Sequence, residues 1–271
     1  MDFGEVGDRG LVLLGCGKMG SAMLRGWLDR GLDPARVWVI EPAPSDWLRG
    51  MGGIHLNDDV PEAPAVLVVA VKPQMMGAAL PGAARLGGGR TVVISIAAGT
   101  RIARFEEVMG ADTPVVRAMP NTPAAIGRGI TALVGNARVT DAQMAMAEAL
   151  LAAIGQTVRL DDEGQMDAVT AVSGSGPAYV FHLIETLAAA GVAEGLPPEM
   201  AMRLAKATVA GAGALAEAAA ETPAQLRVNV TSPNGTTQAA LEVLMDEEVG
   251  FPALLRRAVK AAADRSRELA Q

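Results

Sequence analysis

Short, continuous runs of apolar residues alternate with amphipathic stretches over residues 11–160. A run that is apolar at every position predicts a strand buried on both faces, as in a mostly parallel sheet covered by helices. The runs are rich in β-branched residues, and the segments between them are long enough for helices. They cover residues 11–14, 36–40, 65–71, 91–96, 114–119, 130–134 and 157–160. The pattern predicts an α/β domain of the doubly wound type.

Beyond residue 162 the strand pattern stops, and the chain becomes rich in Ala and Leu at helical spacing. Helices are predicted over 164–195, 197–220, 234–246 and 250–270. The polar stretch LDDEGQ at 160–165 predicts a boundary, with an α/β domain over 1–162 and an all-helical domain over 163–271. Small residues recur over 205–220 and would let helices approach closely. Packing within one chain and an interface that exchanges helices between two chains both fit this pattern.

The first apolar run leads into a glycine motif that opens a helical pattern. Gly15, Gly17 and Gly20 form the spacing G-x-G-x-x-G directly after residues 11–14. Gly15 permits a tight turn, Gly17 lets backbone amides reach a pyrophosphate, and Gly20 lets the helix lie close to the strand. Because the motif follows a predicted strand and precedes a predicted helix, it indicates a dinucleotide site.

Glu41 ends the second predicted strand, about 20 residues after the motif, where NAD-binding proteins place an acid for the adenosine ribose. A carboxylate there would repel a 2′-phosphate and favours NADH. Arg36 or Arg49 could fold over the acid and relieve this repulsion. The sequence therefore leaves the choice between NAD(H) and NADP(H) open.

Three further strand ends are polar or tight-turning, where ligands of such sheets bind. Lys72 could supply local positive charge, and the amide of Asn121 could donate to a carboxamide or a substrate. The small residues of the predicted turn at 96–100 would let a nicotinamide ring approach the backbone. These residues are Ala97, Ala98 and Gly99.

Two loops in the helical half have the composition of helix starts. Ser175 and two glycines precede Pro177, and Pro is favoured in the first turn of a helix. The second loop, SPNG, directly precedes Thr236 and Thr237, which are predicted to lie in the first turn of another helix. Free N–H groups beside hydroxyls suit a carboxylate ligand.

Composition excludes several classes of function. A net charge of −7 and a pI of about 5.0 leave no basic field, so nucleic-acid binding is not expected. The acidic N-terminal residues differ from a secretory signal, and the longest uncharged stretch, 168–184, contains Ser, Gly, Pro and His. A soluble, cytoplasmic protein that does not enter membranes is therefore expected. Cys16, His55 and His182 are the whole set of Cys and His residues and give no metal-ligand spacing.

Taken together, these stretches resemble the pyrroline-5-carboxylate reductase family. The similarity runs in the family's order over residues 11–269 and includes LLGCGKMGSAMLRGWL, VAVKPQ, ISIAAGT, RAMPNTPAAIGRG, DAVTAVSGSGPAYVFHLIETLAAAGV and PAQLRVNVTSPNGTTQAALEVL. The resemblance implies an N-terminal Rossmann domain and a C-terminal helical domain that forms an intertwined homodimer. Dimers of this family often assemble further into decamers.

The resemblance also implies site residues. The nicotinamide cofactor, NADP(H) or NAD(H), would contact Gly15, Cys16, Gly17, Lys18, Met19, Ala70, Val71, Lys72, Pro73, Ala97, Ala98 and Gly99. The substrate carboxylate would be held by Ser232, Pro233, Asn234, Gly235, Thr236 and Thr237. Asn234 departs from the glycine common in the family, and Val228 departs from a frequent acid. Because Asn tolerates a left-handed backbone, the loop geometry should survive.

The implied reaction transfers hydride from NAD(P)H to C5 of 1-pyrroline-5-carboxylate and gives L-proline, the last step of proline biosynthesis. We expect Thr237 to hydrogen-bond the ring nitrogen, with Ser175 and Thr236 orienting the substrate. Tyr179 is an alternative proton donor. A β-hydroxyacid dehydrogenase would share the layout, but that family places a lysine on the first long helix of its second domain, and AVSGSGPAYVFHLIETL has none. A non-catalytic NAD(P)-binding regulator is the alternative from another class.

Overall fold

The chain forms two compact units in the computed structural model, which describes residues 3–269. The described part of unit 1 comprises residues 3–174 and 263–269, and unit 2 comprises residues 175–262. The boundary predicted at residues 162 and 163 falls earlier in the chain. The difference arises because Met166 is 1% exposed and belongs to the hydrophobic core of unit 1.

Unit 1 is built around an eight-stranded sheet with the order β3-β2-β1-β4-β5-β6-β7-β8 among the described residues. Neighbouring strands are parallel except β6 and β7, which are antiparallel. The order reverses at β1, so β1 and β4 lie at the switch point where such sheets bind ligands. The strands are β1 (Leu11–Leu14), β2 (Val37–Ile40), β3 (His55–Leu56), β4 (Val66–Val69), β5 (Val92–Ser95), β6 (Val115–Met119), β7 (Gly129–Gly135) and β8 (Gly155–Arg159).

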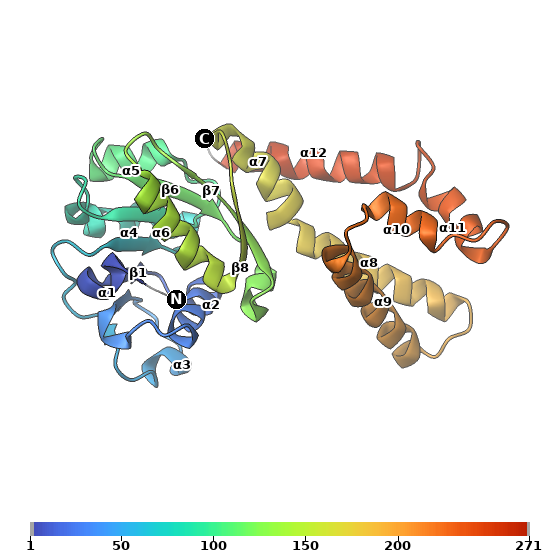
Figure 1. The fold of residues 1–271 in the computed structure, drawn as a ribbon, viewed down its shortest axis with the longest axis horizontal. Coiled ribbons are helices and arrows are strands. Elements are labelled where there is room, and N and C mark those ends of the chain that lie inside the picture. Colours follow the sequence, from blue (N-terminus) through green and yellow to red (C-terminus); the bar gives the residue numbers. More distant parts are fainter. Residues whose placement is uncertain (1–2, 270–271) are drawn as a thin grey trace. The chain divides into compact units, whose positions relative to one another are not determined.

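Helices cover both faces of this sheet, which explains why the central strands are apolar at every position. Leu11 and Leu13 belong to one core cluster, whereas Val12 and Leu14 belong to another, as expected when successive side chains point to opposite faces. The first cluster includes residues of α2 (Lys18–Asp29), α3 (Asp46–Arg49) and α6 (Asp141–Leu151). The second includes residues of α4 (Met76–Ala83), α5 (Ile102–Met109) and α7 (Met166–Val169). Figure 1 shows these helices around the sheet.

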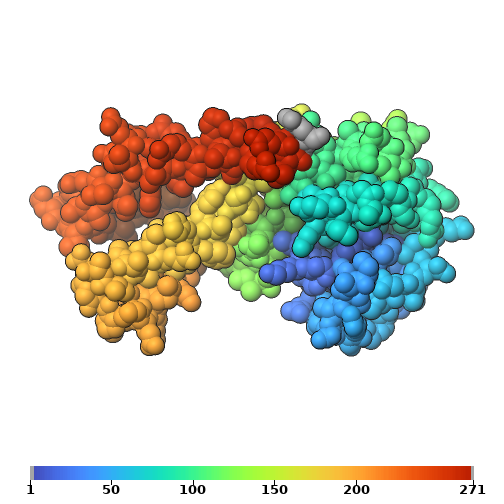
Figure 2. All heavy atoms as spheres, turned by 180° about the vertical axis from the view of Figure 1, so that it is seen from behind, coloured from blue at the N-terminus to red at the C-terminus, as the bar shows by residue number. Residues whose placement is uncertain are grey.

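Unit 1 also contains short elements at its edges. Helix α1 (Glu5–Arg9) precedes β1, and a five-residue π-helical segment, Thr170–Gly174, follows α7. Helices α4 and α5 contact each other, and their blue-green atoms are visible together in Figure 2. Arg117, on β6, is 5% exposed and donates to Glu163 Oε1 at 2.7 Å. The same oxygen accepts from the backbone N of Ile102 at 3.0 Å, so Glu163 joins β6 to the start of α5.

Unit 2 is helical. It contains α8 (Gly176–Ala193), α9 (Pro198–Ala218), α10 (Pro223–Asn229), α11 (Thr236–Leu244) and the first part of α12 (Phe251–Leu269). Helices α8 and α9 pack on each other through Ala188, Ala201 and Ala205, whose small side chains allow close approach. This cluster is the buried core found in the described part of unit 2, and it is small for five helices.

The predicted fold class is confirmed, and the differences are local. Strand β3 and helix α10 were not predicted from the sequence. Strand β3 has only two residues and α10 only seven, so neither produces a long apolar pattern. The predicted helix over 164–195 is divided, because α7 and the π-helical segment precede α8.

Candidate dinucleotide and substrate site

The glycine motif forms a cradle at the carboxyl end of β1. Gly15 has φ +90°, and a Cβ on it would lie 2.8 Å from Val71 Cγ1 and 3.0 Å from Ala70 C and O. A Cβ on Gly20 would lie 2.6 Å from Gly15 O, so the helix rests directly on the turn. By contrast, nothing lies within 4 Å of a Cβ built on Gly17. The cradle thus has the closed and open sides that a pyrophosphate site requires.

Helix α2 begins directly after Gly17, its N-terminal cap residue, and presents its first N–H groups to the open side. Ser21 Oγ donates to Cys16 O at 3.0 Å and fixes the turn from within. Met23, Leu24 and Trp27 are fully buried beneath the helix. The buried face fixes α2 on the core, with the N-terminus of the helix at the open side of the glycine turn.

A cleft of 1170 Å³ opens at this end of the sheet. It is lined by sequence-predicted residues, namely Gly15, Cys16, Gly17, Lys18, Glu41, Ala70, Val71 and Lys72. It is also lined by residues that the sequence analysis missed, among them Ser21, Arg25, Ser45, Trp47, Asn57, Met75, Ala78 and Ala79. Most of these follow β2, β3 or β4, and position at a strand end is the signal that could have found them.

The remaining predicted cofactor residues lie in unit 1 but outside this lining. They are Met19, Gly20, Pro73, Ala97, Ala98, Gly99 and Asn121. Gly99 has φ +74°, as a tight turn after β5 requires. Asn121 Nδ2 donates to Ser173 Oγ at 3.3 Å, and its Oδ1 accepts from Ile130 N at 3.0 Å. The Asn121 amide thus has two partners within unit 1, and a cofactor contact for it remains a prediction.

Cys16 lies inside the glycine turn and is 5% exposed. Burial raises the pKa of its thiol above the ordinary value, and the nearby Glu41 carboxylate adds to this effect, whereas a hydrogen bond with Ser21 opposes it. The thiol therefore stays protonated at neutral pH and acts as a small apolar filler rather than as a nucleophile.

In unit 2, the loop before α11 places free amides and hydroxyls together. Asn234 has φ +58°, and its N–H donates to Gln238 Oε1 at 2.8 Å. Gly235 N donates to Ser232 O at 3.0 Å and closes a tight turn. Thr236 and Thr237 then begin α11, where the first-turn N–H groups have no intrahelical acceptor. Asn234 thus has the left-handed backbone that Asn tolerates, and the survival of the family's loop geometry stays a prediction.

Ser175 directly precedes α8, and Pro177 stands in the first turn, as predicted. In the part of the chain that the structure describes, the Ser175 side chain makes no capping hydrogen bond to the first turn. A substrate contact of the Ser175 hydroxyl stays a prediction. Tyr179 lies one turn further along α8, and His182 Nδ1 lies 3.2 Å from the Glu185 carboxylate on the exposed helix surface.

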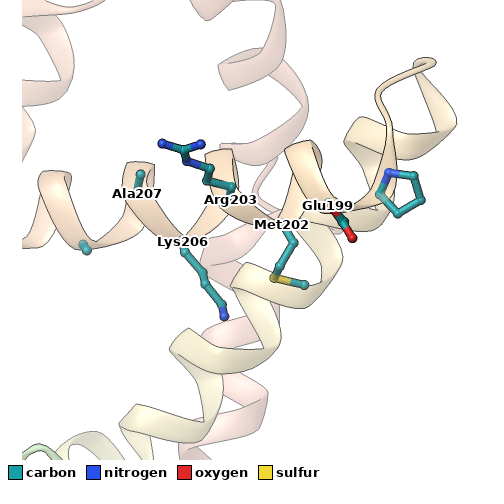
Figure 3. Close-up of a pocket in the computed structure, with 7 residues that line it drawn as sticks. Glu199, Met202, Arg203, Lys206 and Ala207 are labelled. Carbon is teal, nitrogen blue, oxygen red and sulfur yellow. The ribbon is translucent and has the colours of Figure 1, made fainter.

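Two other hollows lack comparable chemistry. One, of 830 Å³, is an open surface along α9, lined by Glu199, Met202, Arg203, Lys206 and small neighbours. Figure 3 shows Arg203 and Lys206 extending from opposite sides of that helix. The other, of 430 Å³, lies between residues 3–6 and α6. Within residues 3–269 no group of three or more His, Cys, Asp or Glu side chains is placed to hold a metal ion.

Known proteins resemble the chain along almost its full length. The family described as "Pyrroline-5-carboxylate reductase dimerisation" matches residues 163–269. The family described as "NADP oxidoreductase coenzyme F420-dependent" matches residues 10–99. A pyrroline-5-carboxylate reductase from Pseudomonas aeruginosa is 41% identical over 266 residues, covering 96% of this chain and 97% of the relative. The chain belongs to the pyrroline-5-carboxylate reductase family. A Synechocystis member of this family is 43% identical over 267 residues, with 96% of this chain and 97% of the relative covered.

Solved pyrroline-5-carboxylate reductases have the same fold. The structure from Coxiella burnetii superposes with a TM-score of 0.90 at 32% identity and covers 97% of this chain and 99% of that one. A Plasmodium falciparum pyrroline carboxylate reductase with NADP bound gives 0.83 at 28% identity, with the same coverage. These matches confirm the resemblance seen in the sequence. Pyrroline-5-carboxylate reductases are NAD(P)H-dependent oxidoreductases that act on the CH–NH group.

The first prediction concerns the glycine cradle. Gly15→Ala should weaken cofactor binding by about tenfold, because φ +90° is unfavourable for Ala and the added Cβ meets Val71 and Ala70. Binding is measured by quenching of tryptophan fluorescence, since Trp47 lines the cleft. Gly82→Ala is the matched control, because no atom lies within 4 Å of a Cβ built there. Equal affinities for the two variants would contradict the cradle.

Proposed function

We propose that this chain reduces the C=N bond of 1-pyrroline-5-carboxylate to give L-proline, with the cofactor bound in unit 1 and the substrate carboxylate bound by residues 232–237. The observation that carries the proposal is the loop before α11. There Asn234 and Gly235 form a turn that leaves the amides of Thr236 and Thr237 beside their own hydroxyls. Such a helix start binds a carboxylate through N–H donors and the helix dipole.

NAD(P)H supplies the hydride when bound. The residues that fit it are those of the glycine cradle and the cleft, where Gly17 is open and the α2 amides are free to take a pyrophosphate. Lys18 and Lys72 line the same cleft and add positive charge near the anion. Ala97, Ala98 and Gly99 stay proposed contacts for the nicotinamide end.

The protein's own task at the reacting nitrogen is small. An imine nitrogen is basic enough to be protonated before reduction, so the site needs a hydrogen-bonding partner rather than a strong acid. The Thr237 hydroxyl takes this role and accepts from the ring N–H, while Thr236 and Ser175 orient the ring. Catalysis is then mainly positioning of the reacting carbon.

The experiment that tests this function mixes purified protein with 1-pyrroline-5-carboxylate and NADH or NADPH and follows the loss of the reduced cofactor. We expect consumption to depend on both substrates and L-proline to accumulate in equal amount. Cofactor binding without consumption would support the non-catalytic regulator instead. Adding L-proline to the same assay measures feedback inhibition.

The second prediction concerns Asn234. Asn234→Gly should keep the substrate KM within about twofold, because glycine accepts φ +58° freely. Asn234→Ala should raise KM by about tenfold, because a left-handed Ala costs about 1–2 kcal/mol and the turn would relax. Cofactor affinity, measured by titration, should be the same in both variants. A KM that is equally low for Ala would show that the turn does not hold the substrate.

We also propose that unit 2 pairs two chains into a homodimer. Its buried cluster is small, and large apolar side chains on its helices are exposed within one chain, including Phe181, Leu187, Leu204, Leu215, Val243 and Leu255. A dimer would bury part of this surface. Light scattering on the purified protein would give the assembly, including any decamer. No helix within residues 3–269 is long and apolar enough to cross a membrane, and the proposed location is the cytoplasm.

A further inference from the structure

The Glu41 carboxylate is held at the rim of the dinucleotide cleft by two backbone amides. Its Oε2 accepts from Cys16 N in the glycine turn at 2.8 Å, and its Oε1 accepts from Ala43 N at 3.0 Å. A carboxylate has about four acceptor positions, so about two remain for a ligand. Only hydrogen-bond donors can fill these positions while the carboxylate is ionised.

Asn57 fixes the backbone of Glu41 from the neighbouring chain segment. Its Oδ1 accepts from Glu41 N at 2.9 Å, and its Nδ2 donates to Glu41 O at 3.0 Å. Asn57 is itself held by donation from its own N to Val39 O at 2.8 Å, and it has φ +58°. Both residues line the cleft. The two hydrogen bonds between the Asn57 side chain and the Glu41 backbone therefore fix the position of Glu41 relative to the glycine turn.

We infer that Glu41, positioned by Asn57, makes this chain selective for a nicotinamide dinucleotide with free ribose hydroxyls, NADH rather than NADPH. This inference rests on the proposed function, because it specifies the cofactor of that reaction. The 2′- and 3′-hydroxyls are donors and match the open acceptor positions of Glu41. A 2′-phosphate brings acceptor oxygens and a charge of about −1.5 to −2 toward a carboxylate.

The two arginines that could fold over Glu41 lie outside the cleft, whereas three other cations line it. Neither Arg36 nor Arg49 is among the cleft residues, and Arg36 Nη1 donates to Asp8 O at 3.3 Å. Lys18, Arg25 and Lys72 do line the cleft. The Arg25 guanidinium lies over the Trp47 ring, 4.9 Å from its centroid. Because Arg25 is held on Trp47 within the cleft lining, we choose it to test whether a cation receives a 2′-phosphate.

The test is direct titration of the full-length protein with NADH and with NADPH, followed by calorimetry, so that the readout does not depend on turnover. Wild type should bind NADH more tightly than NADPH by on the order of 10-fold to 100-fold. Glu41→Ser removes the charge and should bring the two Kd values to within about threefold. If Arg25 has no role in binding a 2′-phosphate, Arg25→Ala shifts both Kd values by the same factor.

Asn57 is tested as a positioning residue. Asn57→Gly removes the side chain while accepting φ +58°, and it should weaken NADH binding by about fivefold. In the Glu41→Ser background the same change should leave both Kd values unaltered, which a merely structural role would not predict. Asn57→Asp keeps the acceptor for Glu41 N, and it replaces Asn57→Gly if that variant is unstable.

Three results would overturn the inference. They are tighter binding of NADPH by wild type, loss of NADPH affinity alone in Arg25→Ala, and an unchanged NADH Kd in Asn57→Gly. Failure of the proposed function has a different signature. In that case NADH binds preferentially, yet neither cofactor is consumed in the presence of 1-pyrroline-5-carboxylate.

Discussion

Replacing Thr237 with Ala lowers kcat by about 100-fold, the expected loss when a positioned hydrogen-bonding group leaves the reacting atom. Thr237 is the second residue of α11 and is half-buried, so its hydroxyl is fixed by the helix and still reachable by a ligand. Without it the ring nitrogen loses its partner in the site, and the carbon that receives hydride is held less well. Steady-state kinetics with saturating cofactor and varied 1-pyrroline-5-carboxylate measure the loss.

Two controls separate this role from a general disturbance of α11. Thr237→Ser keeps the hydroxyl and should restore kcat to within about fivefold of wild type. The Kd for the cofactor should stay at the wild-type value in both variants, because the glycine cradle belongs to unit 1 and Thr237 to unit 2. A Thr237→Ala enzyme with wild-type kcat would remove Thr237 from the mechanism and leave Tyr179, the alternative proton donor, as the next residue to test.

The buried strands were predictable from the sequence because they lie under helices on both faces. Val66–Val69 and Val92–Ser95 are buried at every position, so each strand reads as one apolar run. Strand β3 escaped prediction because its two residues lie at the sheet edge and are half-buried. The antiparallel direction of β7 could not be predicted either, since strand polarity leaves no trace in an apolar run.

The sequence predicts only those residues of the candidate site whose positions follow from the spacing of a local motif. Gly15, Gly17 and Glu41 were found because the first turn and the second strand end have fixed positions in a dinucleotide fold. Asn57 was missed, because its bonds to Glu41 span 16 residues and arise from the pairing of β2 with β3. Trp47 and Arg25 were missed for the same reason, since their contact joins α3 to α2. Contacts that depend on tertiary pairing have no signature in a single sequence.

The ion pair between Arg117 and Glu163 should be the most costly single contact to break in unit 1. The Arg117 side chain is 6% exposed and the Glu163 side chain 29% exposed, and their closest atoms are 2.7 Å apart. Glu163→Ala leaves the Arg117 guanidinium buried without its partner and removes the acceptor for Ile102 N. We expect the free energy of unfolding of unit 1 to fall by about 3 kcal/mol. Urea titration at fixed protein concentration measures it through Trp27, Trp38 and Trp47, which all lie in unit 1.

The matched control is Glu107→Ala, which removes the same charge from an exposed pair with Arg104 on α5. The side chains of that pair are 50% and 68% exposed, so the expected loss is below about 1 kcal/mol. Glu163→Gln keeps an oxygen for Ile102 N and for Arg117 and should lose less than Glu163→Ala. Because Glu163 holds the start of α5 directly after the Ala97–Gly99 turn, Glu163→Ala should also weaken cofactor binding. Equal unfolding free energies for the Glu163 and Glu107 variants would show that burial gives this pair no special weight.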